Sequence, residues 1–390
     1  MEARKNLKNA VEIKYKISKT KAKNIWIDSQ RLNQHNTFGE GSQAVSKAIS
    51  HLGYVQIDTI SVIERCHHHI LYNRIPNYHT KHLHKAQSEE KTVFEYWTHA
   101  LSYVPSEDFK YFVRRMKNTD TSEKTWFGSV SEADYKKVKN LMKKDGPISI
   151  RDIKDDVLVE KTHPWGSSKP SKKALQLGFY KGDFIIAERD GMLKKYELTE
   201  RHFGWKSKPR MVSEADYGEY ILERALRSQG FVSIDSVCYL EPRMKKVIEV
   251  LLAKKVKSSE LIEIEVDGVQ KIKLYIKPQT LDLNISSSEL THILSPFDPL
   301  IIQRKRLNMI FDYEHLFEAY IPKEKRKYGY FTLPVLHQDK IIALLDLKAD
   351  RVQKDLLIQN WVWLDKHKSK ENKKNIENEL DRFEKFQFGI

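Results

Sequence analysis

The sequence predicts an α+β protein in which tandem winged-helix (helix-turn-helix) domains precede a small C-terminal β-barrel. A unit of helices followed by a two-stranded hairpin occurs twice, and Asp190-Gly191 and Asp267-Gly268 provide the tight turns of the two hairpins. A repeated unit favours tandem domains over one unusual domain. After residue 288, prolines divide the chain into short apolar or alternating stretches, a pattern typical of a small antiparallel sheet or barrel.

At 390 residues the chain is too long for one ordinary hydrophobic core, so several domains are expected. The patterns divide it into a basic tail, a first winged-helix-like domain, a second and a third winged helix, and a barrel with a closing helix. We predict these five parts at residues 1–17, 18–145, 146–210, 211–287 and 288–390.

The first domain is predicted to begin with two helices. Ser18 or Thr20 can cap the first, and a second helix over 42–52 ends at Gly53, a residue suited to the left-handed conformation. Residues 54–60 alternate apolar and polar side chains, which predicts a strand. Further helices are expected in this domain at 62–73, 91–101 and 106–116, and again up to residue 144.

The remaining elements follow from the same two periodicities. In the second domain we expect helices and then strands at 150–155, 172–180, 184–187 and 193–198. In the third domain the corresponding elements are expected at 214–228, 233–240, 244–253, 262–266 and 271–276. The C-terminal strands and the closing amphipathic helix are predicted at 331–336, 341–347, 357–364 and 371–386.

The charge balance favours a polyanionic partner. The formal net charge is +15, from 68 Lys and Arg against 53 Asp and Glu. Basic charge raises the local concentration of polyanions, and nucleic acid is the commonest of these. A Lys-rich surface without a specific partner fits the same numbers, so charge alone leaves both interpretations open.

Cysteine usage and hydropathy argue against several other classes. Cys66 and Cys238 lie far apart, which excludes a disulfide framework and a CxxC metal or redox motif. No apolar run approaches the roughly 20 residues that span a bilayer, and the N-terminus lacks the apolar region of a secretory signal. The sequence therefore predicts a cytoplasmic protein without membrane contact.

Gln56 and Asp58 are the first candidates for catalysis. On a strand they point to the same face, about 7 Å apart from the strand rise. A carboxylate and an amide so placed can hold a water molecule, and the carboxylate can accept its proton or face a developing cation. The same two residues also fit an exposed polar strand edge, or an Asp58 that caps the following helix.

Runs of residues along the chain resemble the YcaQ/AlkZ family of winged-helix DNA glycosylases, which act in crosslink repair. Residues 52–61 resemble the motif region of this family, and the Gln-x-Asp form resembles its YcaQ branch. The resemblance spans residues 18 to 385 and is more specific than any single motif. It continues through Glu64-Arg65, His67-His68-His69, Arg74, Pro76, Tyr78, the block 93–100, Ser295-Pro296-Phe297-Asp298-Pro299-Leu300, Arg304-Lys305-Arg306, Tyr328-Gly329-Tyr330 and the block 345–351.

The resemblance implies tandem winged helices and a C-terminal β-barrel around a concave DNA-binding face. It also implies hydrolysis of the N-glycosidic bond of N7-alkylated guanine, including crosslinked guanine, in double-stranded DNA. In this chemistry Asp58 would activate water and stabilise the cationic sugar, and Gln56 would position water and sugar. The motif contains no lysine that suggests a Schiff base, so we expect a monofunctional enzyme without lyase chemistry. We further expect a monomer that needs no cofactor.

Several basic residues are candidates for DNA contact. His67, His68 and His69 point about 100° apart on a helix and cannot converge on one metal ion, so we expect no metal site. All three are candidates for DNA contact: one of them could contact phosphate or the lesion, and the others are expected to be packed or hydrogen-bonded. His99 is interpreted as a core residue, with a place on the DNA-binding face as the less favoured alternative. Arg74 is a further candidate. Lys169, Lys172 and Lys173 are candidates at the start of a recognition helix, and Arg304 and Arg306 are candidates on a segment expected to be extended.

Three other functions fit parts of the pattern. A winged-helix transcription regulator would bind DNA without chemistry and would be a dimer on a palindromic site. A glycosylase-like protein that has lost catalysis is a second alternative, which the intact Gln-x-Asp pair disfavours. A nuclease fits less well, because no carboxylate cluster suited to Mg²⁺ is apparent in the sequence.

Overall fold

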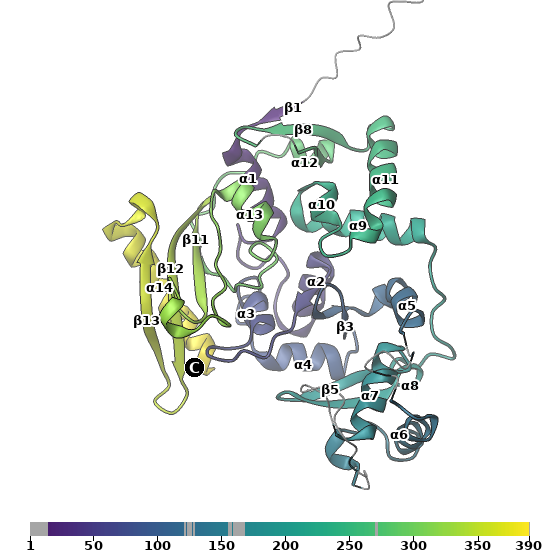
Figure 1. The fold of residues 1–390 in the computed structure, drawn as a ribbon. Coiled ribbons are helices and arrows are strands. Elements are labelled where there is room, and N and C mark those ends of the chain that lie inside the picture. Colours follow the sequence, from purple (N-terminus) through teal and green to yellow (C-terminus); the bar gives the residue numbers. More distant parts are fainter. Residues whose placement is uncertain are drawn as a thin grey trace, which may run out of the picture.

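The computed structural model describes residues 15–120, 122, 127, 129–154, 158, 168–269 and 272–389. They form an α+β fold in which three helix-and-hairpin units and a C-terminal sheet lie around one another. Figure 1 shows most of the first unit in the centre, the second unit below it and the third unit above it. The C-terminal sheet lies at the left of this view.

The first unit runs from a capped helix to a three-stranded sheet. Ser18 caps the first helix through a hydrogen bond from Lys21 N, and Gly53 ends the second helix with a φ of 82°. The sheet has the order β2-β4-β3. The elements are α1 (Lys19–Ser29), α2 (Gly41–Leu52), β2 (Val55–Gln56), α3 (Cys66–Tyr72), α4 (Thr80–Ser88), β3 (Val93–Trp97) and β4 (Leu101–Pro105).

Two sequence predictions for this unit are wrong. Residues 91–101 form β3 and part of β4 instead of a helix, because Val93, Phe94 and Tyr96 are β-branched or aromatic and pair along the strand with β4. The helix α4 was not predicted. The predicted strand 54–60 is reduced to two residues, so Gln56 is the last residue of β2 and Asp58 lies beyond it.

The second unit confirms the predicted hairpin at Asp190-Gly191. An isolated bridge between Ile148 and Tyr196 adds a third short strand position to it. The helix α6 shares its core with this unit, since Val138 and Met142 pack with residues of α7 and β5. The elements are η1 (Ser106–Asp108), α5 (Phe109–Lys117), α6 (Glu132–Asp145), η2 (Ile150–Asp152), α7 (Pro170–Tyr180), β5 (Phe184–Asp190), β6 (Leu193–Leu198) and α8 (Thr199–Phe203).

The third unit has the same order of elements and recruits a strand from the N-terminus. β1 (Tyr15–Ile17) pairs in parallel with β8, so the predicted tail ends before Tyr15; residues 1–14 lie outside the described residues. The sheet order is β1-β8-β9-β7. The elements are α9 (Glu214–Gln229), β7 (Phe231–Val232), α10 (Ile234–Val237), η3 (Pro242–Met244), α11 (Lys245–Lys257), β8 (Ile262–Val266), β9 (Leu274–Ile276) and α12 (Pro278–Leu281).

In all three units a helix, a short strand position, two helical segments and a hairpin follow one another, which is the order expected of a winged helix. Their assignment as winged helices stays a prediction, as do the domain boundaries drawn from the sequence.

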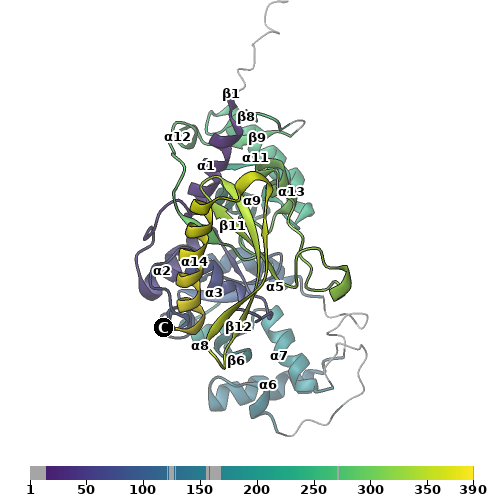
Figure 2. The same cartoon turned by 90° about the vertical axis from the view of Figure 1, so that its left-hand side faces the viewer.

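The C-terminal part forms an open sheet, so the prediction of a β-barrel is wrong for residues 288–389. Its strand order is β10-β11-β12-β13, with β10 and β13 as the two edges. The helix α14 contacts both edge strands and buries Ile376 and Phe383 in the core (Figure 2). It thereby covers apolar side chains that a closed barrel would otherwise enclose. The elements are β10 (Thr291–Ile293), α13 (Arg304–Phe311), η4 (Lys323–Lys325), β11 (Thr332–His337), β12 (Lys340–Asp350), β13 (Asp355–Trp363), η5 (Asp365–His367) and α14 (Lys370–Phe388).

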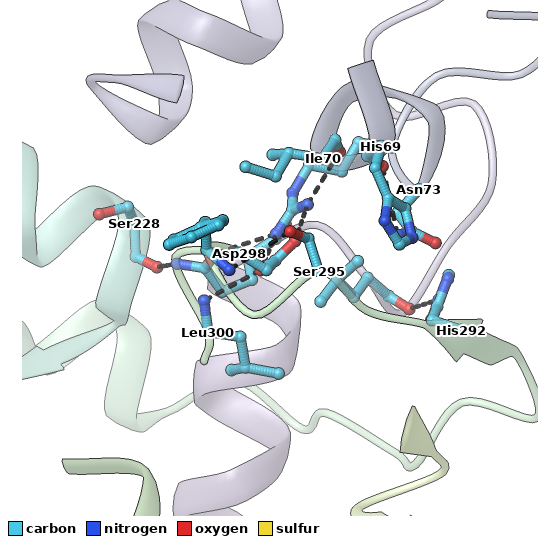
Figure 3. Close-up of polar contacts among 12 residues, drawn as sticks. His69, Ile70, Asn73, Ser228, His292, Ser295, Asp298 and Leu300 are labelled. Atoms are coloured by element: carbon cyan, nitrogen blue, oxygen red, sulfur yellow. Dashed lines mark hydrogen bonds and ion pairs between the residues drawn. The ribbon is translucent and has the colours of Figure 1, made fainter. Parts of the chain in front are cut away.

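A buried ion pair joins the first unit to the C-terminal part. Arg74, just after α3, donates to both carboxylate oxygens of Asp298 at 2.7 and 2.9 Å, and both side chains are fully buried. Arg74 also donates to Ile70 O and to the backbone and side-chain oxygens of Gln30. Gln30 in turn donates to Ser228 O of α9, so the network reaches the third unit as well. Figure 3 shows Asp298 between Ile70 and Ser228.

Two buried histidines extend this junction on the side of β10. His69 Nε2 and Asn73 Nδ2 both hydrogen-bond to Ile293 O, at 2.8 and 2.9 Å, and His292 Nε2 bonds to Leu32 O at 2.7 Å. Burial lowers the pKa of His69 to about 4 and that of His292 to about 3. Both rings are therefore neutral near pH 7 and act as packed, hydrogen-bonded core groups.

A second buried ion pair joins the first and second units. Arg189 of β5 donates to both oxygens of Glu95 on β3, at 2.5 and 2.6 Å, and Gln87 of α4 donates to Glu95 and to Ile186 O. Buried ion pairs therefore attach both the C-terminal part and the second unit to the first unit, which carries the Gln-x-Asp segment.

Removing one partner of the central ion pair is expected to destabilise the whole protein. Arg74→Met should lower the free energy of unfolding by about 3–5 kcal/mol, because Asp298 is left buried without its counter-charge. Thermal unfolding followed by circular dichroism measures this. The double variant Arg74→Met/Asp298→Leu should recover part of the loss, and equal stability of Arg74→Met and the native chain would contradict the assignment.

The buried histidines predict acid lability. Unfolded histidine binds its proton near pH 6.5, whereas folded His69 and His292 do so only near pH 4 and 3, so the unfolded chain takes up more protons between these values. Their contribution to stability is complete above about pH 6.5 and is lost progressively as the pH falls through this window. The midpoint of thermal unfolding, measured from pH 7.5 to 4.5, should fall less steeply in His69→Gln/His292→Gln; parallel curves would refute this origin.

Candidate active site

Gln56 is held in place by a histidine from the neighbouring hairpin. It pairs with Ser102 of β4, and only 7% of its surface is exposed. Its Oε1 lies 2.9 Å from Nε2 of His99, which belongs to the turn Thr98–Ala100 between β3 and β4. The sequence favours a core position for His99; in the structure it is partly exposed and lies against the candidate motif.

His99 is neutral in this setting. Burial, with smaller effects of Arg224 and Arg115, lowers its pKa to about 4. A neutral imidazole whose Nε2 faces an amide oxygen carries its proton on Nε2, so His99 donates to Gln56 Oε1. Tyr54 and Tyr239 pack against the ring in edge-to-face geometry, at centroid distances of 5.0 and 5.3 Å, and restrict its orientation. The Gln56 amide is thereby oriented, with its NH₂ group left to donate elsewhere.

Asp58 lies just beyond the last ladder contact of β2. Ile57 N donates to Leu101 O at 2.8 Å, and the chain then leaves the sheet. Asp58 Oδ1 accepts a 2.8 Å hydrogen bond from Ile60 N, which forms a local turn and orients the carboxylate. The side chain is partly exposed, and no donor among the described residues reaches its Oδ2. The carboxylate is therefore positioned by its own turn while one oxygen can accept from water.

Cys66 packs directly behind the motif. Its Sγ donates to Gln56 O at 3.2 Å, and burial, followed by the charge of Asp58, raises the pKa of the thiol well above its usual value. A protonated, buried thiol is not a nucleophile, so this cysteine supports the backbone of the motif instead of taking part in chemistry.

A cavity of about 530 Å³ opens beside His99. It lies between the β3–β4 hairpin, α5, α9 and α10, so all three units contribute to its wall. The cavity combines aromatic rings with guanidinium groups, a pairing suited to bases and phosphates. These side chains are Tyr54, Trp97, Tyr217, Tyr239, Arg114, Arg115, Arg224 and Arg243.

Gly53 lies against Arg224, which lines this cavity. Gly53 has a φ of 82°, and a Cβ on it would lie 2.2–2.3 Å from the side-chain carbons of Arg224. Arg224 lies over the rings of Tyr54 and Tyr220, at 5.8 and 5.5 Å from their centroids. A glycine is therefore required here both for the helix end and for the close approach of this arginine.

The three consecutive histidines have different surroundings in the structure. His67 is buried, with its ring 4.3 Å from that of His68 and 5.7 Å from that of Tyr103, and burial lowers its pKa. His69 is buried against Ile293 O, as described above. His68 is partly exposed and bonds to Tyr78 OH at 2.7 Å. His67 and His69 are buried core groups, so His68 is the one of the three that stays a candidate for DNA contact.

Two of the predicted DNA-binding arginines are also interior. Arg74 belongs to the ion pair with Asp298. Arg306 is 5% exposed, lies between the rings of Trp26 and Phe231 at 4.4 and 4.3 Å, and donates to Phe231 O. Both are corrected to structural roles. Arg304 is partly exposed at the start of α13, so the expectation of an extended segment is also wrong.

The lysines at the start of α7 differ from one another. Lys172 is exposed, and Lys169 is the partly buried residue that precedes Pro170 at the helix start. Lys173 is 2% exposed, and its Nζ donates to Ser129 Oγ at 2.9 Å. Lys173 is therefore unsuited to bind phosphate at the surface, whereas Lys169 and Lys172 stay candidates.

The sequence contained a signal for His99. It lies in the block 93–100, which carries part of the family resemblance, and reading this block as a hairpin strand would have placed it beside β2. The helix predicted for residues 91–101 does not place His99 beside β2, so the sequence analysis missed this contact.

Comparisons with known proteins agree with this architecture. Residues 49–386 match the family described as DNA glycosylase AlkZ-like. Among solved structures, the DNA glycosylase AlkZ of Streptomyces sahachiroi has a similar fold, with a TM-score of 0.57 over 95% of this chain and 97% of that chain at 13% identity. Within the described residues, no helix is both long and apolar enough to cross a bilayer. The family match covers most of the sequence, and the chain belongs to the AlkZ-like family of DNA glycosylases, enzymes that cleave N-glycosidic bonds in DNA.

Proposed function

We propose that this enzyme hydrolyses the N-glycosidic bond of N7-alkylated guanine in double-stranded DNA and thereby unhooks interstrand crosslinks. The observation that carries the proposal is the pairing of an oriented carboxylate, Asp58, with an oriented amide, Gln56, two residues apart at the end of β2. The proposal includes a monomer that acts without a cofactor.

The chemistry needs little help with the leaving group. Alkylation at N7 places a positive charge on the purine, which departs as neutral 7-alkylguanine when its bond to C1′ breaks. The sugar becomes oxocarbenium-like, water adds to C1′, and the proton of that water passes to a base and then to solvent. A carboxylate serves both steps, because its charge stabilises the cation and its free oxygen accepts the proton. Asp58 Oδ2 is the oxygen suited to this role.

Gln56 supplies the second function. His99 occupies its Oε1, so the amide NH₂ is the part of the side chain that can donate to the attacking water or to a sugar oxygen. Preorganised donors lower the barrier because no reorientation is needed during the reaction. His99 is thus proposed as a positioning residue for Gln56.

The basic and aromatic surroundings support a DNA substrate. The net charge of +15 favours association with a polyanion. Arg115 and Arg224, which line the cavity beside His99, would place cationic groups close to the backbone of a bound duplex.

Asp58→Asn should abolish base release while DNA binding is kept. Asparagine retains an oxygen for the turn with Ile60 N but loses the negative charge, so the rate should fall by about 10²–10⁴-fold. The assay is single-turnover release of 7-methylguanine from duplex DNA, with affinity measured by fluorescence anisotropy. Asp312→Asn, at an exposed carboxylate that pairs with Lys19, is the control. Unchanged release by Asp58→Asn would remove this residue from the mechanism.

His99→Phe tests the positioning of Gln56. Phenylalanine keeps the packing against Tyr54 and Tyr239 but cannot donate to Oε1, so a hydrogen bond of about 1 kcal/mol is lost. We expect kcat for base release to fall by roughly 5- to 10-fold with KM nearly unchanged. A higher KM with native kcat would instead assign His99 to substrate binding.

A further inference from the structure

The segment that follows Asp58 is held by the far end of the chain. Residues 59–65 join the Gln-x-Asp motif to α3 and form no helix or strand of their own. Their backbone groups nevertheless find partners nearly 300 residues away. Ala349 N, near the end of β12, donates to Val62 O at 2.7 Å.

Arg351 makes the principal side-chain contact with this segment. It is the first residue of the turn between β12 and β13, and its Nη2 donates to Ser61 O at 2.8 Å and to Ile63 O at 3.2 Å. One guanidinium nitrogen therefore joins two carbonyls on either side of Val62, whose own carbonyl is held by Ala349. Two residues, Ala349 of β12 and Arg351 of the turn, therefore hold three consecutive carbonyl groups.

The helix α14 completes the attachment. Gln387 Oε1 accepts from Glu64 N at 2.6 Å, and Glu384 Oε1 accepts from Leu356 N of β13 at 2.9 Å. The same helix thus supports the end of the segment and the hairpin that carries Arg351. Asp350 Oδ1 accepts from Val352 N and Gln353 N, which fixes the turn itself.

We propose that Arg351 is a positioning residue for Asp58, which it orients by holding residues 61–63. The inference rests on the proposed function of Asp58. The connection is short: Asp58 Oδ1 accepts from Ile60 N, and Ile60 is joined directly to the clamped residues. If residues 61–63 shift, the amide of Ile60 shifts with them and the carboxylate loses its fixed orientation.

Arg351 is exposed, so its removal leaves no buried cavity and no buried unpaired charge. Catalysis is more sensitive than folding to such a change, because a displacement of about 1 Å at a reacting group can cost 10²-fold in rate. A direct contact between Arg351 and a DNA phosphate is a different role, and it would act on affinity and its salt dependence.

The test compares Arg351→Gln and Arg351→Lys with the control Arg326→Gln. Arg326 lies in the C-terminal part of the chain, and its guanidinium donates to Ile321 O. Single-turnover release of 7-methylguanine and DNA affinity at several salt concentrations are measured. Arg351→Gln should lower the release rate by about 10- to 100-fold with affinity within about twofold of native. Arg351→Lys should recover part of the rate, and Arg326→Gln should behave as the native enzyme.

Hydrogen–deuterium exchange of the peptide covering residues 59–65 gives a readout that does not depend on activity. Arg351→Gln should speed exchange in this peptide, whereas Arg326→Gln should leave it unchanged. Native exchange, or weakened affinity with a smaller salt dependence and a native release rate, would overturn the proposal. If the native enzyme releases no base, the proposed function fails, while the exchange data still decide whether Arg351 holds the segment.

Discussion

The architecture depends on the buried ion pair between Arg74 and Asp298. Two charges removed from water are tolerated only when they are fully paired, and here the guanidinium meets both carboxylate oxygens and three further acceptors. The pair joins the helix that follows the Gln-x-Asp segment to the C-terminal part, and through Gln30 it reaches α9. Arg74 and residues 295–300 both belong to the stretches that resemble the family. This part of the family pattern therefore corresponds to a structural junction and not to the catalytic motif.

This junction explains why the candidate site is composite. Gln56 and Asp58 come from one short stretch, yet each is oriented by a distant element. His99 of the β3–β4 turn holds the amide, and the end of β12 holds the segment after the carboxylate. Catalytic preorganisation of this kind requires parts that do not move relative to one another. The two buried ion pairs, Arg74–Asp298 and Glu95–Arg189, provide that rigidity.

Local patterns predicted much of the fold. Helix starts and ends followed from Ser18 and Gly53, and the hairpin at Asp190-Gly191 followed from its turn chemistry. The failures share one cause, which is that tertiary contacts overrode a local pattern. Residues 91–101 became strands because β4 pairs with β3 and β2, and the C-terminal sheet stays open because α14 covers its core.

The site was only partly accessible to sequence reasoning. Gln56 and Asp58 were identified as candidates, but the partners that orient them lie 43 and about 290 residues away, at His99 and Arg351. Arginines and histidines also look alike in a sequence whether they face DNA or the core. Arg74, Arg306, His67 and His69 were candidates for DNA contact, and all four are buried. Arg74 pairs with Asp298, Arg306 lies between two aromatic rings, and His69 bonds to Ile293 O.

The most direct test is the fate of a duplex with a nitrogen-mustard crosslink between two guanine N7 atoms, followed on a denaturing gel with the native enzyme. The account predicts that the strands separate and that alkali then cleaves one strand at the new abasic site. Tight binding with the crosslink intact and no alkali-labile site would contradict it.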